Sequence, residues 1–256
     1  MKKYIKNFEV KANLHLNELY SVLKLTPVDG LMPDMYPGQF VQVLIENSGH
    51  TYLRRPISIN FLDKEKNELW LLVRGAGEGT KSLLRIDVGS ILNLVLPLGK
   101  GFSLKSERAL LVGGGVGVAP LLLLGKTLNE HGTDVSFLLG ARSGADLLLV
   151  DEFAKYGTVF LSTEDGSIGE EGLVTCNSAM QSDFDIIQCC GPLPMMKAVA
   201  KIARRRGIEC EVSLENMMAC GLGACLCCVE DTVSDGNVCV CKEGPVFNIN
   251  ELKWQI

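Results

Sequence analysis

Residues 110–120 read LLVGGGVGVAP, an apolar run that leads into a glycine-rich stretch and ends at a proline. This order predicts a buried strand, a tight turn and a helix start, because Pro120 lacks the N–H that a first helical turn leaves unbonded. The backbone N–H groups of such a turn favour a bound phosphate. The pattern Gly115-x-Gly117-x-x-Pro120 departs from the dinucleotide fingerprint G-x-G-x-x-G, and a purely structural turn also needs glycine.

Apolar runs and helical segments alternate around this turn. The expected strands are Ala109–Val112, Val135–Leu139, Thr158–Ser162 and Asp185–Gln188, and the expected helices are 120–130 and Pro194–Arg206. Such alternation indicates a parallel α/β sheet with right-handed crossovers. Residues 1 to about 100 instead hold short apolar stretches between turn signals, which is typical of a small antiparallel β-barrel. These stretches are Phe40–Ile45, Ile57–Phe61, Leu69–Val73 and Ile91–Val95.

The C-terminal region carries a cysteine pattern. Cys220, Cys225 and Cys228 form a C-x4-C-x2-C run, and a fourth cysteine follows at Cys239 or Cys241. This spacing matches the plant-type [2Fe–2S] ligand pattern. Spacing alone does not separate Cys239 from Cys241, since residues two apart on an extended strand face the same side. Four thiolates also suit a zinc-stabilised binding module, although paired C-x2-C knuckles are the usual zinc spacing.

Composition narrows the functional classes. The 256 residues carry a formal net charge of −5, which argues against a nucleic-acid or anionic-membrane surface. Residues 109–125, the longest uncharged stretch, are too short and too rich in glycine for a typical membrane span. Ten cysteines without a recognisable signal peptide predict a reducing, cytoplasmic location. Three scattered histidines offer little material for a His-based metal site.

Three further motifs suit a bound cofactor. Residues 54–58 (RRPIS) offer a guanidinium fork and a hydroxyl, although an exposed strand start is the simpler interpretation. Residues 74–83 (RGAGEGTKSL) place Thr-Lys-Ser near a helix start, where a pyrophosphate or an ordinary N-cap fits. Residues 189–196 (CCGPLPMM) follow a buried strand, at the end where open α/β sheets bind ligands; core packing is the alternative.

In this order, R-P-x-S, G-x-G-T, GGGxGxxP and C-G-P resemble the ferredoxin–NADP reductase superfamily over nearly the whole chain. Residues 215–228 (ENMMACGLGACLCC) and 241–247 (CKEGPVF) resemble, more narrowly, the electron-transfer subunits of NAD-dependent (class 1B) dihydroorotate dehydrogenases. The resemblance implies an antiparallel FAD-binding barrel over 1–102, a parallel-sheet NAD-binding α/β domain over 103–208 and a small [2Fe–2S] domain over 209–256.

The resemblance also implies site residues. Arg55 is expected at the FAD phosphates, and Ile57 and Ser58 beside the isoalloxazine ring. The FAD set is Arg55, Pro56, Ile57, Ser58, Leu72, Val73, Arg74, Gly79, Thr80, Lys81 and Ser82; the nicotinamide-nucleotide set is Gly114, Gly115, Gly117, Cys190 and Gly191. A carboxylate in residues 163–167 (TEDGS) favours NAD over NADP, unless Arg142 pairs with a phosphate.

For the cluster, the resemblance implies Cys220, Cys225, Cys228 and Cys241 as metal ligands, because the family's fourth ligand precedes a K-[DE]-G-P-V-F segment. Cys227 departs from the small residue commonly found at its position. The apolar residues near the ligands are either a partner interface or part of a small core: Leu222, Leu226, Val246 and Phe247.

The implied function is electron transfer in pyrimidine (UMP) biosynthesis, from dihydroorotate through [2Fe–2S] and FAD to NAD+. The substrate base would lie in an FMN-containing catalytic subunit, so no catalytic residue is assigned to this chain. A heterotetramer with two copies of each subunit is implied, with no nucleic acid and no membrane insertion. The rival interpretation is an FAD/[2Fe–2S] NAD(P)H diaphorase subunit of a hydrogenase or an electron-bifurcating transhydrogenase.

Overall fold

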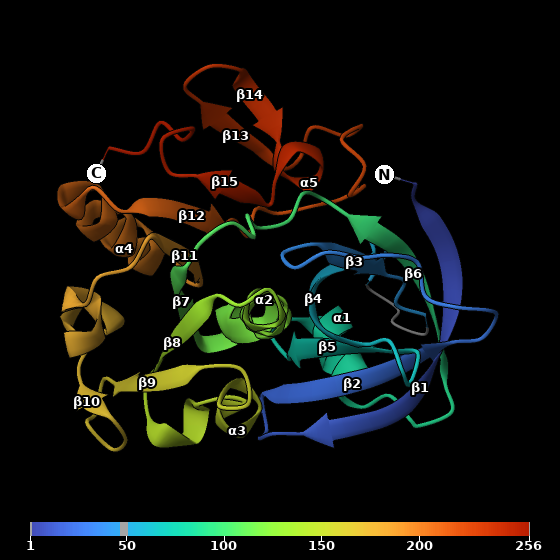
Figure 1. Cartoon of the computed structure of the whole chain (residues 1–256). Helices are drawn as coiled ribbons and strands as arrows, with labels where there is room; N and C mark the ends of the chain where they lie inside the picture. Colours follow the sequence, from blue (N-terminus) through green and yellow to red (C-terminus); the bar gives the residue numbers. More distant parts are fainter. Residues whose placement is uncertain (1, 47–50, 256) are drawn as a thin grey trace. The chain divides into compact units, whose positions relative to one another are not determined.

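The computed structural model describes residues 2–46 and 51–255, and Figure 1 shows their elements in chain order. The chain divides into two compact units. The barrel unit comprises Met1–Gly101, Glu215–Val229 and Cys239–Pro245, and the sheet unit comprises Phe102–Leu214, Glu230–Val238 and Val246–Ile256. The cysteine-rich C-terminal segment is therefore shared between the units, and the expected division into three domains stays a prediction.

The barrel unit is built on a closed antiparallel barrel in the order β1-β2-β5-β4-β3-β6, which confirms the predicted architecture. Leu23 lies opposite Leu71 on neighbouring strands, and both side chains are fully buried, as expected where alternate residues fill a barrel. Its elements are β1 (Tyr4–His15), β2 (Tyr20–Pro27), β3 (Phe40–Val43), β4 (Arg55–Asp63), β5 (Glu68–Arg74), α1 (Glu78–Leu84) and β6 (Ile91–Leu98).

The sheet unit contains the predicted parallel sheet, in the order β10-β9-β8-β7-β11-β12-β15. The pairs run parallel except for β15, which is antiparallel to β12. Residues 109–114 of β7 are buried without alternation, as expected for a strand covered on both faces. The strands are β7 (Arg108–Gly114), β8 (Asp134–Ala141), β9 (Thr158–Thr163), β10 (Glu170–Glu171), β11 (Ile186–Cys190), β12 (Glu209–Ser213) and β15 (Val246–Asn248).

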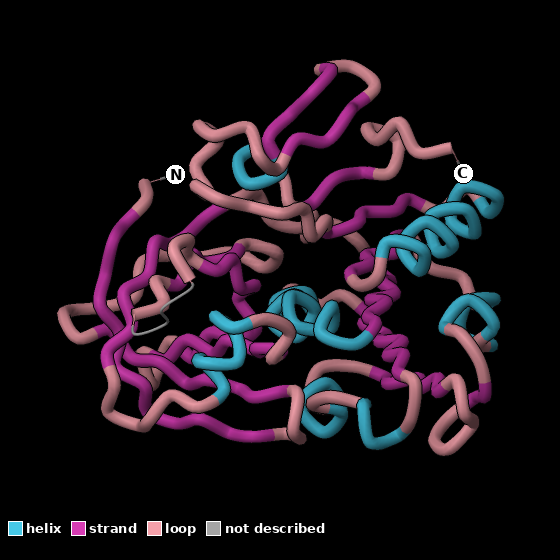
Figure 2. The backbone as a smooth tube through the Cα atoms, turned by 180° about the vertical axis from the view of Figure 1, so that it is seen from behind, coloured by secondary structure: helices cyan, strands magenta, loops and turns pink. Residues whose placement is uncertain are grey.

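Helices cover both faces of this sheet. Figures 1 and 2 show α2 (Ala119–Glu130) on one face and α4 (Leu193–Arg206) on the other. Because α2 leads from β7 to β8 and α4 leads from β11 to β12, the strand order reverses between β7 and β11. Such a switch point is where open α/β sheets bind ligands, at the carboxyl ends of the strands.

The remaining elements are short. They are η1 (Gly115–Val118), η2 (Gly144–Asp146), α3 (Val150–Phe153), η3 (Val174–Cys176), η4 (Ser178–Gln181), β13 (Val229–Thr232), β14 (Gly236–Cys239) and α5 (Val240–Glu243). Strands β13 and β14 form a separate two-stranded sheet.

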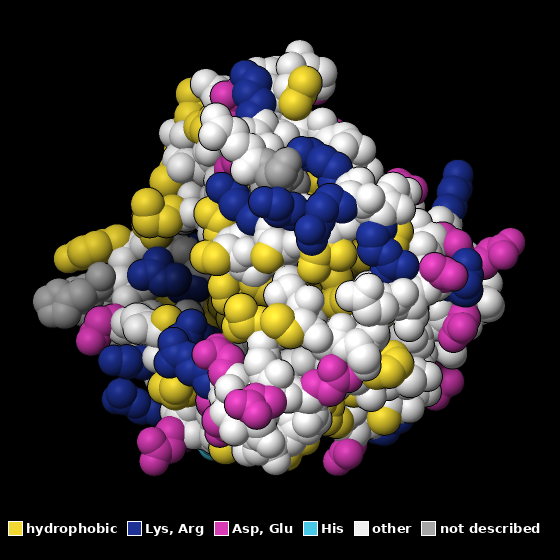
Figure 3. Space-filling view, turned by 90° about the vertical axis from the view of Figure 1, so that its left-hand side faces the viewer, with side chains coloured by type: hydrophobic (Ala, Val, Ile, Leu, Met, Phe, Trp, Pro, Cys, Tyr) yellow, Lys and Arg dark blue, Asp and Glu magenta, His cyan; other side chains and the backbone are white. Residues whose placement is uncertain are grey.

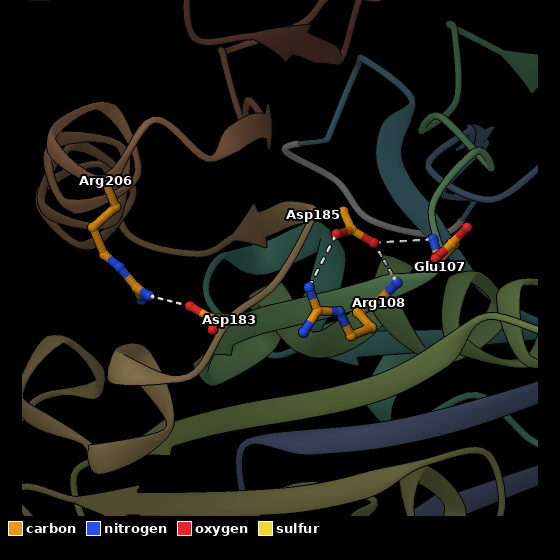
Figure 4. Close-up of polar contacts among 5 residues, drawn as sticks. All are labelled: Glu107, Arg108, Asp183, Asp185 and Arg206. Carbon is orange, nitrogen blue, oxygen red and sulfur yellow. Dashed lines mark hydrogen bonds and ion pairs between the residues drawn. The ribbon is translucent and has the colours of Figure 1, made fainter.

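Polar contacts fix the loop before β11 at the amino ends of the strands, away from the switch point (Figure 4). The Asp185 carboxylate accepts the backbone N–H groups of Glu107 and Arg108 at 3.2 and 2.8 Å, which ties the start of β11 to the start of β7. Arg206 of α4 reaches the same loop through a 3.4 Å contact with Asp183. Lys and Arg side chains gather on the face that α4 occupies (Figure 3), and α4 ends in Arg204–Arg206, favourably placed at the negative end of its dipole.

Candidate functional site

The cysteine loop, residues 219–228, carries three of the four predicted ligands and lies in the barrel unit. The thiol of Cys220 interacts with that of Cys225, and the thiol of Cys241 interacts with that of Cys228. Cys228 and Cys241 are almost fully buried, whereas Cys225 is exposed. The Cys241 thiol also interacts with Cys220, and the Cys239 thiol interacts with Cys220, Cys225 and Cys228, so the four predicted ligands and Cys239 lie together in one group of thiols.

Backbone N–H groups of the loop point at these sulfurs. Leu222 and Ala224 donate to Cys220 Sγ at 3.3 and 3.4 Å, and Gly223 donates to Cys241 Sγ at 3.1 Å. Gly221 and Gly223 both have positive φ angles, +68° and +82°, which lets the backbone turn tightly enough to do this. N–H donors around sulfur stabilise a thiolate and help to set the potential of an iron–sulfur cluster.

The thiols differ in acidity. Burial opposes ionisation of Cys220, but N–H groups of the loop outweigh it and lower the pKa of this thiol to about 6. Burial, followed by the neighbouring Cys228 thiol, raises the pKa of Cys241 to about 12. Cys220 is therefore largely a thiolate at neutral pH without any metal, whereas Cys241 must lose its proton when a metal binds.

Cys239 and Cys241 occupy different elements, contrary to the expectation that both lie on one extended strand. Cys239 ends β14, and Cys241 lies in the short helix α5, because the chain turns between them. Both thiols interact with Cys228. However, Cys239 Sγ faces the Gly223 carbonyl at 3.8 Å, whereas Cys241 Sγ accepts the Gly223 N–H. A carbonyl suits a protonated thiol, and an N–H group suits a thiolate.

The donor set fits a two-iron cluster. In residues 2–46 and 51–255, no three His, Cys, Asp or Glu side chains converge as ligands of a single metal ion. A [2Fe–2S] cluster takes four cysteine ligands and divides them between its two irons, so a gathering of thiols at this spacing suits it. Cys227 is exposed and is assigned no ligand role.

The predicted FAD residues cluster on β4, β5 and α1. Gly79 lies directly against the Arg55 side chain, since a Cβ at Gly79 would lie 3.0 Å from Arg55 Nε and from Thr51 Cγ2. The neighbouring Arg54 has a structural role instead: it donates to the Asn93 carbonyl at 2.8 Å and to the Asn93 side chain at 2.6 Å. Arg55 itself donates to the Leu53 carbonyl at 2.9 Å, and its side chain lies beside the first turn of α1.

The other predicted FAD residues are placed as follows. Helix α1 begins at Glu78, two residues before the Thr-Lys-Ser that was expected at its start. The Thr80 hydroxyl accepts the Gly77 N–H at 3.1 Å, and the Ser82 hydroxyl donates to the Gly79 carbonyl at 2.8 Å. Ile57, Leu72 and Val73 are buried, Pro56 and Ser58 are half-buried, and Arg74 and Lys81 are exposed.

The two motifs of the sheet unit meet at the switch point. Cys190 pairs with Gly113 across β11 and β7, so the C-G-P turn follows directly beside the glycine-rich turn. A Cβ at Gly117 would lie 2.5 Å from the Cys190 carbonyl oxygen and the Gly191 Cα, and one at Gly114 would lie 2.6 Å from Met195 Sδ. These close contacts account for glycine at positions 114 and 117.

Residues 163–167 form a tight turn after β9. Asp165 Oδ1 accepts the N–H of Ser167 at 3.0 Å, and hydrogen bonds from Ser167 lower the pKa of this carboxyl. The Asp165 N–H donates to the Arg142 carbonyl at 3.2 Å, so the carboxylate expected to favour NAD and the arginine expected to favour NADP come from adjacent turns.

Comparisons with known proteins identify the families to which the two regions are similar. The family model for the iron–sulfur cluster binding domain of dihydroorotate dehydrogenase B matches residues 215–253, and that for the oxidoreductase NAD-binding domain matches residues 111–201. The electron transfer subunit of dihydroorotate dehydrogenase B (NAD(+)) from Shouchella clausii is 43% identical over 84% of this chain and 86% of the relative. The same subunit from Fusobacterium nucleatum is 40% identical over 85% of this chain and 86% of the relative.

Solved structures share the fold. An NADH-dependent reduced ferredoxin-NADP oxidoreductase, described in connection with flavin-based electron bifurcation, superimposes with a TM-score of 0.86 and 30% identity over 96% of this chain and 90% of that one. The cytochrome b5 reductase domain of Ulva prolifera nitrate reductase has a TM-score of 0.66 and 17% identity, over 80% of this chain and 94% of that one.

The fold and the site thus define an iron–sulfur oxidoreductase of the ferredoxin–NADP reductase type. This confirms the expected FAD, [2Fe–2S] and NAD. The chain belongs to the family of electron transfer subunits of dihydroorotate dehydrogenase B (NAD(+)). No helix in the described part of the chain is both long and apolar enough to cross a membrane.

Proposed function

We propose that this chain transfers electrons released by dihydroorotate oxidation, by way of a [2Fe–2S] cluster and FAD, to NAD+ in pyrimidine biosynthesis. The observation that carries this proposal is the cysteine segment, which matches the dihydroorotate dehydrogenase B family model and brings its thiols together. The cluster supplies one-electron transfer, and the flavin links it to the two-electron chemistry of the nicotinamide.

We assign Cys220, Cys225, Cys228 and Cys241 as the cluster ligands. The N–H groups of Leu222, Gly223 and Ala224 support this assignment, because they already point at the sulfurs of Cys220 and Cys241. These donors stabilise the negative charge on the ligating sulfurs.

Arg55 and the first turn of α1 are proposed to hold the FAD phosphates. Gly114, Gly115 and Gly117 are proposed to face the nicotinamide nucleotide, together with Cys190 and Gly191. The packing of Gly79 on Arg55, and of Gly117 on the backbone of Gly191, supports both assignments. The remaining FAD residues keep the roles that family resemblance implies: Pro56, Ile57, Ser58, Leu72, Val73, Arg74, Thr80, Lys81 and Ser82.

Replacement of Arg55 by alanine should weaken FAD retention. A charge-assisted hydrogen bond to phosphate contributes about 1.5–3 kcal/mol, which corresponds to a loss of about tenfold or more in affinity. The measurement is the FAD content per chain after gel filtration, followed by titration of the apoprotein with FAD. Arg85→Ala removes an exposed arginine of the same unit and should retain the full flavin content. A full flavin content in Arg55→Ala would remove Arg55 from the site.

The catalytic partner is proposed to be an FMN-containing dihydroorotate dehydrogenase subunit, assembled with this chain as a two-plus-two heterotetramer. Met217, Leu222 and Leu226 are 83%, 45% and 65% exposed around the cysteine loop, which supports a partner that docks there. Val246 and Phe247 are buried and belong to the core instead. The reducing, cytoplasmic location inferred from the ten cysteines remains part of the proposal.

Anaerobic affinity purification of the chain from its native extract tests the function. Dihydroorotate-dependent reduction of NAD+ should co-purify with an FMN-containing subunit. The second candidate is an electron-bifurcating or diaphorase subunit, which the TM-score of 0.86 to the ferredoxin-NADP oxidoreductase favours. It predicts a complex that oxidises NADH with artificial dyes but does not respond to dihydroorotate, and that outcome would replace the first proposal.

A further inference from the structure

Gln42 is a buried amide without a hydrogen-bond partner. It lies in the middle of β3, within the apolar run Phe40–Val43, and its side chain is fully buried. Neither Nε2 nor Oε1 has a partner among the described residues. A buried amide that makes no hydrogen bond is destabilising, and in native proteins such a group usually has a partner or a functional reason.

The amide lies beneath the cysteine loop. A Cβ at Gly221 would lie 2.8 Å from both Cγ and Nε2 of Gln42, so this side chain packs on the backbone beside Cys220. Phe40 lies two residues earlier on the same face of β3. A Cβ at Gly99 would lie 3.1 Å from Phe40 Cε1 and 2.6 Å from Pro245 Cδ, so Phe40 lies near the residues that follow Cys241. This face of β3 is therefore covered by the proposed cluster segment.

We propose that Gln42 is a positioning and potential-setting residue, whose Nε2 donates a hydrogen bond to a sulfur of the [2Fe–2S] site. The sulfurs of a cluster accept hydrogen bonds and offer no donor, so the amide NH2 is the end that suits them. The loop supplies backbone donors to Cys220, and Gln42 adds a side-chain donor from beneath. The inference rests on the proposed cluster function and extends it to a residue outside the cysteine segment.

The expected consequence is a change of cluster potential. A hydrogen bond to sulfur stabilises the reduced cluster more than the oxidised one, because reduction adds negative charge. Gln42→Met keeps an unbranched side chain of similar length and removes the donor. We expect the one-electron equilibrium to shift about tenfold toward the oxidised cluster, which is a fall of ~59 mV in midpoint potential.

Gln39 provides a matched control. It is also buried and close to β3, but its Nε2 donates to the Gly99 carbonyl at 2.9 Å and its Oε1 accepts the Tyr36 N–H at 2.8 Å. Gln39→Met should therefore lower thermal stability and leave the cluster potential unchanged. A fall of the same size in both variants would overturn the proposal, since it would indicate a general effect of a disturbed barrel.

The experiment is an EPR-monitored redox titration of the anaerobically purified chain, with the FAD potential followed optically in the same sample. An unchanged cluster potential in Gln42→Met, or a shift confined to FAD, would overturn the role of Gln42 while leaving the cluster in place. Absence of a [2Fe–2S] signal from the unmodified chain would instead overturn the cluster proposal, and Gln42 with it.

A spectroscopic readout separates a hydrogen bond from a packing effect. With 15N in the glutamine side-chain amides, pulsed EPR of the reduced cluster should detect a coupled nitrogen that is lost in Gln42→Met and retained in Gln39→Met. Retention of that coupling in Gln42→Met would contradict the assignment.

Discussion

Cys220→Ser should abolish the [2Fe–2S] EPR signal of the reduced protein while FAD remains bound. Cys220 accepts two N–H bonds from its loop, and these lower the pKa of its thiol to about 6, which favours the thiolate that binds iron. A serine hydroxyl is a much weaker ligand for the iron of a cluster than a cysteine thiolate. The FAD residues lie on other elements, so the flavin spectrum should remain that of the unmodified protein. The measurement is EPR after reduction, with iron and flavin determined per chain.

Cys239→Ser is the matched control for this prediction. Its thiol faces the Gly223 carbonyl, and the variant should keep its EPR signal nearly intact, whereas Cys241→Ser should lose it. Loss of the signal in Cys239→Ser with retention in Cys241→Ser would move the fourth ligand from Cys241 to Cys239. An unchanged signal in Cys220→Ser would remove the assignment of the first ligand.

Gly117→Ala should disrupt the glycine-rich turn of the sheet unit, which is proposed to face the nucleotide. The new methyl group would lie 2.5 Å from the backbone of Cys190 and Gly191, and backbone has less room to yield than the end of a flexible side chain. We expect a destabilisation of about 3 kcal/mol or more, and a fall of roughly 6–12 °C in apparent Tm. Affinity for NADH should fall at least tenfold, because the turn and the C-G-P segment must separate to accommodate the methyl group.

Gly207→Ala distinguishes this clash from ordinary glycine strain. Gly207 ends α4 with φ +67°, and a Cβ there meets nothing within 4 Å. Its replacement should cost about 1–2 kcal/mol through backbone strain alone and leave NADH affinity unchanged. Differential scanning calorimetry and a fluorescence titration with NADH measure both quantities. Equal losses of stability and affinity in the two variants would show that the close approach at Gly117 has no special role.

Much of the fold is predictable because its signals are local. The apolar run of β7 and the proline at the start of α2 depend on residues within a dozen positions, and the structure has β7 at Arg108–Gly114 and α2 at Ala119–Glu130. The boundaries shift by a few residues, since strand ends are set by pairing with β8 and β11. Helix α1 likewise begins two residues earlier than the Thr-Lys-Ser motif predicted, because the Thr80 hydroxyl accepts the N–H groups of Ala76 and Gly77 and draws the preceding residues into the first turn.

The sequence by itself determined the kinds of chemistry available: four thiols at cluster spacing, a phosphate-binding turn and an arginine at a strand start. These follow from covalent spacing, which brings neighbouring residues together whatever the rest of the chain does. The tertiary structure adds what spacing leaves open: it gives Arg54 a partner in Asn93, places Cys239 and Cys241 on different elements, and leaves the Gln42 amide without a partner among the described residues. Each distinction depends on which N–H, carbonyl or glycine a distant segment places beside the side chain, and long-range packing alone decides that.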